Sequence, residues 1–169
     1  FGQLAQLVGQ SFGQNEALVK EVAERKRTEQ TLRESEEKYR LVVNNVSEAI
    51  LVGQDWKVVF ANPSASKIIG YRQQQLLGLS FNDFIHPDDR WLVADGYRRR
   101  LAGEHIRERL EFRIVRQYGE TRHLEVSAVH IDWMGRPATL SFLADITERR
   151  NAENALRESE EQFRRAFED

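Results

Sequence analysis

The side chains most suited to catalysis or metal binding form a short cluster in the middle of the chain, His86-Pro87-Asp88-Asp89. An imidazole beside two carboxylates is a candidate for metal binding or for acid–base catalysis. The same cluster is also typical of a helix start, because proline suits the first helical position and acidic residues suit the positive end of the helix dipole. We favour the helix start, so the cluster predicts local structure rather than chemistry.

The remaining residues that could do chemistry do not assemble into a site. His105, His123 and His130 lack metal-ligand spacing, and only His130 has the strand parity that would place it at the edge of a pocket. There is no Gly-rich phosphate loop, no Ser–His–Asp arrangement and no Cys. A basic stretch is interpreted as a solvated face paired to local glutamates: Arg98, Arg99, Arg100, Arg107, Arg109, Arg113 and Arg116. We therefore predict no catalytic and no metal site, and expect any kinase or cyclase activity to lie in a domain outside this segment.

Composition argues against two further classes of protein. The 169 residues include 25 Lys+Arg and 27 Asp+Glu, a formal net charge of −2 that does not favour nucleic-acid binding. No apolar run approaches the ~20 residues needed to span a bilayer, so no direct membrane insertion is predicted. We expect a cytoplasmic location.

Two charge-rich segments flank the middle of the chain and repeat each other. Glu24–Arg40 and Glu148–Arg164 are identical at ten of 17 positions, at a constant offset of 124. This offset is too long for a solenoid and is the spacing of one linker helix plus one domain. We therefore predict a linker helix over 1–35, a domain over 36–146, and a second linker helix over 147–169 that leads into a second, truncated domain.

The first linker helix carries a seam of residues at alternating spacings of four and three. This pattern predicts a two-stranded coiled coil and hence a homodimer. Its apolar members are Leu18, Val22, Leu32, Tyr39 and Val43. Charged residues interrupt the seam, so weak pairing is expected, and a single solvated helix packed on its own domain is the alternative.

The middle segment predicts an α+β domain. Apolar runs at Ala49–Gln54 and Lys57–Ala61 read as a β-hairpin, short helices follow as far as Ile85, and a longer helix ends at Ala102. Three alternating strands are then expected over 106–117, 121–132 and 138–146, the last with Leu140, Phe142 and Ala144 on its inner face. One antiparallel sheet with helices on one face satisfies this order of elements.

Several motifs resemble the PAS sensory domain. They are Val59-Phe60-Ala61-Asn62-Pro63, Gly70-Tyr71, Phe84-Ile85-His86-Pro87-Asp88-Asp89-Arg90, Glu111-Phe112-Arg113 and Asp145-Ile146-Thr147-Glu148-Arg149, the last resembling the PAC-type signalling motif. The resemblance covers about residues 36–150. It implies a five-stranded antiparallel PAS sheet, an internal pocket for a small molecule, dimerisation through the leading helix and output through the trailing one. Trp56 and Tyr118 depart from the turn residues that are usual in the family.

The resemblance also suggests site residues. The expected pocket lining is Phe60, Ile69, Leu77, Phe84, Val93, Tyr97, Leu110, Phe112, Leu124, Val126 and Phe142, although these side chains would also pack as an ordinary core. Arg113 and Asp145 occupy matching family positions and are predicted to pair, which together with Thr147 would tie the sheet to the trailing helix and transfer a signal. Phe1–Ala5 resembles part of a HAMP linker, so the segment could be the cytoplasmic part of a membrane-anchored sensor.

The cofactor question is only partly decided by the sequence. The light-sensing flavin subclass of the family needs a Cys near the pocket, so the absence of Cys excludes a covalent flavin adduct. The haem subclass uses an axial His from the long helix, and 87–102 contains none, so haem is not expected. The cofactor therefore stays unknown, and non-covalent flavin stays open.

Two functions remain at this stage. The first is a sensory and dimerisation module of a bacterial signal-transduction protein of the two-component type, which passes ligand- or partner-dependent changes through its flanking helices to an output domain. The alternative is a redox sensor of the same fold that binds flavin non-covalently.

Overall fold

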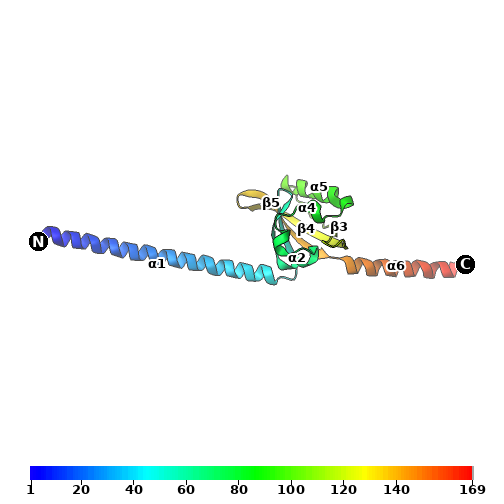
Figure 1. Cartoon of the computed structure of the whole chain (residues 1–169), viewed down its shortest axis with the longest axis horizontal. Coiled ribbons are helices and arrows are strands. Elements are labelled where there is room, and N and C mark those ends of the chain that lie inside the picture. Colours follow the sequence, from blue (N-terminus) through cyan, green and yellow to red (C-terminus); the bar gives the residue numbers. More distant parts are fainter. Residues whose placement is uncertain (169) are drawn as a thin grey trace. The chain divides into compact units, whose positions relative to one another are not determined.

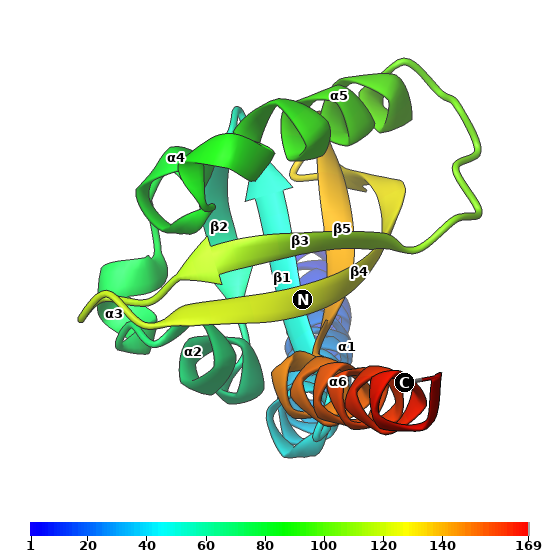
Figure 2. The same cartoon turned by 90° about the vertical axis from the view of Figure 1, so that its right-hand side faces the viewer.

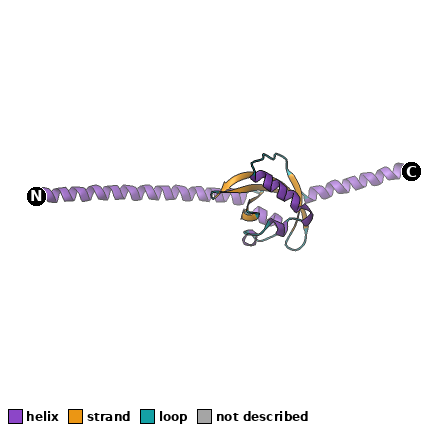
Figure 3. Cartoon of the chain, turned by 90° about the horizontal axis from the view of Figure 1, so that it is seen from above, coloured by secondary structure: helices purple, strands orange, loops and turns teal. Residues whose placement is uncertain are grey.

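The computed structural model describes residues 1–168 and divides into two units between Asn45 and Val46. The first unit is α1, Gly2–Asn45, one uninterrupted helix of 44 residues in which no side chain is buried (Figure 3). The boundary predicted between residues 35 and 36 therefore lies inside a continuous helix. None of the helices within residues 1–168 is both long and apolar enough to cross a bilayer.

The second unit has the predicted α+β architecture. Its elements are β1 (Ala49–Gln54), β2 (Lys57–Ala61), α2 (Pro63–Ile69), α3 (Gln73–Leu76), α4 (Phe81–Phe84), the 3₁₀ helix η1 (Pro87–Asp89), α5 (Arg90–Leu101), β3 (Leu110–Val115), β4 (Thr121–Trp133), β5 (Arg136–Asp145) and α6 (Thr147–Glu168) (Figure 1). The strands form a five-stranded antiparallel sheet in the order β2-β1-β5-β4-β3. The predicted fold class is thereby confirmed.

Local sequence explains the turn and cap at the start of the sheet. Asp55 and Trp56 join β1 to β2 with φ angles of 50° and 62°, the left-handed pair that matches the twist of a two-residue hairpin. The fully buried Asn62 then caps α2, because its Oδ1 accepts from the amides of Ile50 and Ala65, both at 2.9 Å. The Asn-Pro step thus fixes both the end of β2 and the start of α2.

One predicted strand is too long. Residues 106–109 are not part of β3, which begins at Leu110, opposite Val126 of β4. An alternating sequence forms a strand only where a neighbouring strand supplies hydrogen bonds. β3 pairs with β4 from Leu110 to Val115 and not before.

The helices α2 to α5 cover one face of the sheet (Figure 2), and the core lies between them. The inner face of β5 carries Thr139, Ser141 and Leu143, all buried. The prediction for this strand was therefore wrong by one residue, since Leu140 and Phe142 point to the opposite, outer face. Alternation pointed to the wrong face, because the outer face of β5 carries the larger apolar side chains, Leu140 and Phe142, whereas the inner face carries the hydroxyls of Thr139 and Ser141.

Candidate functional site

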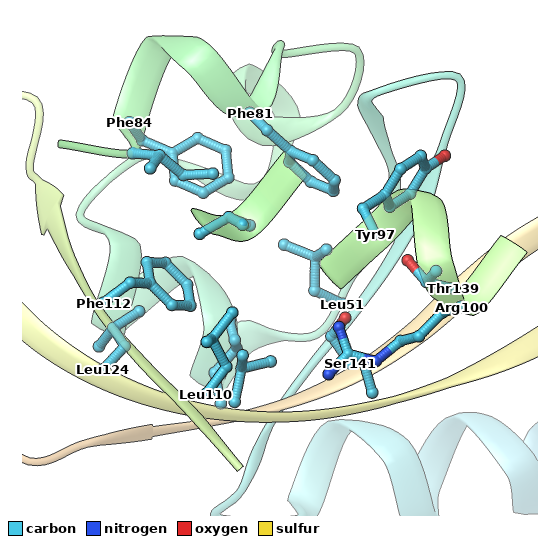
Figure 4. A pocket seen from close by; sticks show the side chains of 15 residues that line it. Leu51, Phe81, Phe84, Tyr97, Arg100, Leu110, Phe112, Leu124, Thr139 and Ser141 are labelled. Atoms are coloured by element: carbon cyan, nitrogen blue, oxygen red, sulfur yellow. The ribbon is translucent and has the colours of Figure 1, made fainter. Parts of the chain in front are cut away.

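A cavity of about 50 Å³ lies between α4, α5 and the inner face of the sheet (Figure 4). Its wall is apolar except at one side. The lining consists of Leu51, Phe81, Phe84, Ile85, Val93, Tyr97, Arg100, Leu110, Phe112, Leu124, Val126, Ala128, Thr139, Ser141 and Leu143. A single water occupies about 10–15 Å³ on this kind of measure, so the space suits a few waters or a small molecule.

The structure brings together seven of the eleven residues expected around a pocket. They are Phe84, Val93, Tyr97, Leu110, Phe112, Leu124 and Val126. On β3 and β4 the alternation was read correctly, because the positions between the inward residues are polar and only one face is apolar. Whether a ligand occupies the space stays a prediction.

Phe60 and Phe142 do not line the cavity. Phe142 lies on the outer face of the sheet for the reason given above, opposite Ile50 of β1. In β2, the pairing with β1 shifts register between Val52 and Gly53, so that the buried positions of β2 are no longer spaced by two. Phe60 therefore lies on the outer face of the sheet, where its ring is 6.0 Å from that of Trp133.

Ile69 and Leu77 are also absent from the cavity wall. Ile69 is completely buried, but it fills the core beneath α2. Leu77 is 48% exposed, whereas its neighbour Leu76 is fully buried. The short helix α3 ends at Leu76, so the phase of its buried position was wrong by one residue.

Sequence reasoning missed eight lining residues, of which the polar ones matter most. Thr139 and Ser141 were missed with the orientation of β5, and Arg100 was grouped with its exposed neighbours Arg98 and Arg99. The other five are Leu51, Phe81, Ile85, Ala128 and Leu143. No local signal marks Arg100, because the sequence of three arginines does not show which one faces inward.

Aromatic rings close the cavity at the hairpin end. The Trp56 ring packs edge-on against Phe81 at 5.1 Å and against Tyr97 at 5.3 Å. Its Nε1 donates to Asn82 Oδ1 at 3.1 Å. Phe81 in turn lies against β1 where a Cβ on Gly53 would approach its ring to 2.3 Å, so this contact requires glycine. Packing thus accounts for a tryptophan at a left-handed turn position.

The predicted ion pair between Arg113 and Asp145 is wrong. Arg113 instead binds Asp89, with Nη2 to Oδ1 at 2.7 Å and Nε to Oδ2 at 2.9 Å. Arg113 lies on the edge strand β3, with β4 between it and β5, and the segment before α5 pairs with the free edge of β3 through the bridge between Ile85 and Ile114. The predicted helix start is retained, since His86 Nδ1 accepts from the Asp88 amide at 3.2 Å.

The pairing with Arg113 stabilises the ionised form of the Asp89 carboxylate. Asp89 Oδ2 also accepts from the Arg113 backbone amide at 2.7 Å. The side-chain hydrogen bonds from Arg113 lower the pKa of Asp89 below its ordinary value of 3.8, against the opposing effect of burial. The Asp89 carboxylate therefore holds the start of α5 against the edge strand β3. Its hydrogen bonds to Arg113 give it a structural role in the His86–Asp89 cluster.

Asp145 and Thr147 join the sheet to α6. Thr147 Oγ1 donates to Asp145 Oδ1 at 2.6 Å and accepts from the His123 amide at 2.9 Å. The amide of Ile146, which is only 4% exposed, donates to the His123 carbonyl at 2.9 Å. Asp145 additionally lies 3.5 Å from Arg122. The two residues therefore lie at the predicted junction, although not with the predicted arginine.

Arginines of α6 extend this junction. Arg150 Nη1 donates to Glu111 Oε2 at 2.7 Å, and Arg149 lies 3.8 Å from Glu125. Glu111 belongs to β3 and Glu125 to β4, so α6 is held by the two strands that also line the cavity.

The cavity does not fit a flavin. The three fused rings of the isoalloxazine far exceed 50 Å³, a volume well below the ~150 Å³ of an engineered cavity that holds benzene. Among the residues that the structure describes, no group of three or more His, Asp or Glu side chains is placed to hold a metal ion.

The sequence of this domain matches a known protein family. The family model described as "PAS fold" matches residues 58–142, half of the chain. The chain belongs to the PAS family. The fold of this PAS domain is shared with solved PAS structures.

Two of those structures are similar in sequence as well as in fold. The PAS domain of an HTR-like protein from Haloarcula marismortui is 26% identical with a TM-score of 0.60, over 72% of this chain and 99% of that chain. A sensory box histidine kinase/response regulator from Burkholderia thailandensis is 28% identical with a TM-score of 0.55, over 76% of this chain and 98% of that chain.

Curated relatives include sensor kinases. Sporulation kinase E of Bacillus subtilis is 29% identical over 148 residues, which are 87% of this PAS domain's chain and 19% of the kinase. Sporulation kinase A of the same organism is 27% identical over 150 residues, 85% of this chain and 24% of the kinase. The chain thus spans only about a fifth to a quarter of the length of these kinases.

Proposed function

We propose that the chain is a sensory and dimerisation module of a multi-domain signal-transduction protein of the two-component type. Binding of a ligand or a partner to the PAS domain changes its conformation, and the flanking helices transmit this change to an output domain. The relatives named as kinases match over a small part of their length, which supports a sensory segment whose kinase activity resides elsewhere.

One observation carries the proposal: neighbouring residues of the same strand serve the cavity and the junction with α6. In β4, Leu124 and Val126 line the cavity, while the His123 backbone amide donates to Thr147 and the Glu125 side chain lies beside Arg149. Side chains of a pleated strand alternate between its two faces, so a displacement of the inward pair moves the strand backbone and the Glu125 side chain with it. β3 repeats the arrangement, since Glu111, between two lining residues, binds Arg150.

The exposed seam of α1 supports dimerisation. Leu18, Val22 and Leu32 are 56%, 48% and 58% exposed, and no residue of the 44-residue helix is buried. Long helices in water derive most of their stability from packing an apolar face. A second copy of the chain along this seam supplies that packing, and a seam interrupted by charges can exchange between two arrangements at low cost.

A fusion protein tests signal transfer. The chain is joined through α6 to the catalytic core of a histidine kinase, and autophosphorylation is measured for insertions in α6 of one whole heptad and of roughly half a heptad. The whole heptad restores the helical phase and should preserve activity, whereas the half heptad should change it roughly 5–150-fold. Equal activity for all insertions would contradict transmission through α6.

A matched pair of substitutions tests the path from the cavity. Ala128→Leu fills the cavity, whereas Val129→Leu enlarges a neighbouring side chain that is 52% exposed. We expect the first and not the second to change autophosphorylation of the fusion. The effect of Ala128→Leu should shrink when Glu111→Gln and Arg150→Gln remove the contact between β3 and α6, and an undiminished effect would contradict transmission through this contact.

A further inference from the structure

The cavity contains a buried positive charge without a counter-ion. Arg100 lies in the last turn of α5 and is 5% exposed. Its Nε has no hydrogen-bond partner, and its guanidinium takes part in no hydrogen bond or ion pair among residues 1–168. Its neighbours differ, since Arg98 pairs with Asp95 at 2.6 Å and Arg99 with Glu104 at 2.7 Å.

Helix geometry holds the guanidinium inward. Gly96 lies one turn before Arg100, and a Cβ built on it would be 3.1 Å from Arg100 Nη1. The absence of a side chain at Gly96 therefore leaves room for Arg100 to lie along α5 toward the cavity. No Asp or Glu lines the cavity, so nothing on its wall compensates the charge.

An uncompensated charge in this place is unfavourable. Transfer of an ion out of water costs several kcal/mol unless it is paired and hydrogen-bonded. Burial lowers the pKa of Arg100, and the charge of Arg99 acts in the same direction, yet an arginine remains protonated in proteins. An anion that enters the cavity would remove this penalty.

Two hydroxyls lie on the same side of the cavity. Thr139 and Ser141 are 3% and 9% exposed, and in the described part of the chain neither hydroxyl forms a hydrogen bond. Figure 4 shows Arg100, Thr139 and Ser141 gathered at one end of the cavity, with Phe84, Phe112 and Leu124 toward the other. The cavity is therefore polar and positive at one end and apolar at the other.

This inference rests on the proposed sensory function and names its ligand. We propose that the cavity binds a small aliphatic monocarboxylate, whose carboxylate pairs with the Arg100 guanidinium and accepts from Thr139 and Ser141, and whose hydrocarbon part lies beside Phe112 and Leu124. The planar guanidinium matches the two oxygens of a carboxylate. The cavity volume of about 50 Å³ limits the hydrocarbon part of the ligand to a few carbons.

The cavity also has a route to its surroundings at the same residue. Arg100 and Ala128 line both the cavity and an open groove bounded by residues 103–107 and by Ser127–His130 of β4. A carboxylate in the groove reaches the guanidinium before it reaches the apolar end. Arg100 is therefore placed to select anions at the entrance.

Calorimetric titration of the whole 169-residue chain tests the ligand class. The probes are acetate and propionate, each compared with its own amide as the uncharged isostere, and inorganic phosphate as an anion of another shape. We expect at least one carboxylate to bind, and its amide and phosphate to bind at least about tenfold more weakly, since hydrogen bonds to charged groups contribute about 1.5–3 kcal/mol. Equal binding of the matching amide, or no binding of either carboxylate, would overturn the proposal.

Two variants locate the charge. Arg100→Gln should weaken carboxylate binding by about 10–150-fold, whereas the matched Arg98→Gln, at an exposed arginine paired with Asp95, should bind as the wild type does. In the absence of ligand, Arg100→Gln should raise the melting temperature, because it removes a buried unpaired charge. Unchanged carboxylate affinity, or a lower melting temperature, would show that the Arg100 guanidinium is not an anion-binding group.

These outcomes are separable from those of the kinase fusion. The insertion series and Ala128→Leu use no carboxylate. If the fusion responds to them and no carboxylate binds, the ligand class is wrong and signal transfer stands. If a carboxylate binds through Arg100 and the fusion does not respond, transmission is wrong and the ligand stands.

Discussion

The two helices that share a sequence, α1 and α6, differ in what holds them. Arg25 of α1 and Arg149 of α6 occupy equivalent positions of the repeat. Arg25 lies 3.8 Å from Glu21 of its own helix, whereas Arg149 lies 3.8 Å from Glu125 of β4. The repeated sequence therefore does not encode the junction: the sheet does, through acidic residues of β3 and β4 presented to α6.

What the two helices have in common is an exposed apolar seam. Leu32 and its equivalent Leu156 are 58% and 62% exposed, and Tyr39 and Phe163 are 74% and 67% exposed. The repeat thus carries the seam that we propose as a pairing surface, and Glu111 of β3 and Glu125 of β4 anchor α6. The predictions below test this division, from the largest expected effect to the smallest.

The first prediction contrasts the sheet with the seam. Ile114→Ala, at a fully buried position of β3, should lower the free energy of unfolding of the domain by about 2–5 kcal/mol through lost burial and a cavity. Leu156→Ala, on the exposed seam of α6, should change it by less than about 0.5 kcal/mol. Chemical denaturation measures both, and comparable losses would mean that the seam stabilises the domain directly.

The second prediction concerns pairing through α1. Leu32→Asp should raise the dimer dissociation constant about tenfold or more, because burial of a leucine side chain contributes about 1.5–3 kcal/mol, and removal of residues 1–35 should raise it further. Thr31→Asp, one residue away from the seam, is the matched control. Sedimentation at equal protein concentration gives the constants, and an unchanged dimer after truncation would place the interface on the outer face of the sheet instead.

The third prediction tests the anchor between the start of α5 and the edge strand β3. Asp89→Asn should destabilise the domain by about 1–2 kcal/mol at neutral pH, since it weakens charge-assisted hydrogen bonds to Arg113. The folded-state pKa of Asp89 is lowered, so its contribution is complete above the ordinary value of 3.8 and is lost as the pH falls through the lower folded-state pKa. The difference in melting temperature between wild type and Asp89→Asn should therefore be constant near neutrality and shrink below about pH 3.8. A difference independent of pH would exclude this carboxylate as its source.

The smallest effect is expected at the first residue of α6. Thr147→Ala leaves the His123 amide without its acceptor and should speed hydrogen exchange in the first turn of α6, with a loss of about 0.5–1.5 kcal/mol typical of one intramolecular hydrogen bond. Thr147→Ser keeps the hydroxyl and should restore protection. If Thr147→Ala exchanges as the wild type does, the anchor resides in Arg149 and Arg150 alone.

Much of the fold was accessible from the sequence because local chemistry decides it. The Asp55-Trp56 turn, the Asn62 cap and the Gly70 end of α2 each follow from residues within a few positions of one another. Of the strands, only β3 and β4 were read correctly at the candidate site, because polar residues such as Glu111 and Glu125 separate their inward positions. Phe84 of α4 and Val93 and Tyr97 of α5 were also expected there. On β5 the inner face carries Thr139 and Ser141 and the outer face carries Leu140 and Phe142, so the same reasoning chose the wrong face.

By itself the sequence determined the PAS architecture, the repeat of the flanking helices and their exposed seams, since periodicity, caps and turn residues act over short distances. Only the tertiary structure decided which of three adjacent arginines is buried, which acid Arg113 meets and which face of β5 lines the cavity. Each of these depends on strands and helices that are distant in sequence: strand order places Arg113 beside Asp89, and the packing of α5 over the sheet directs Arg100 inward. Long-range packing supplies those partners, and no local pattern contains them.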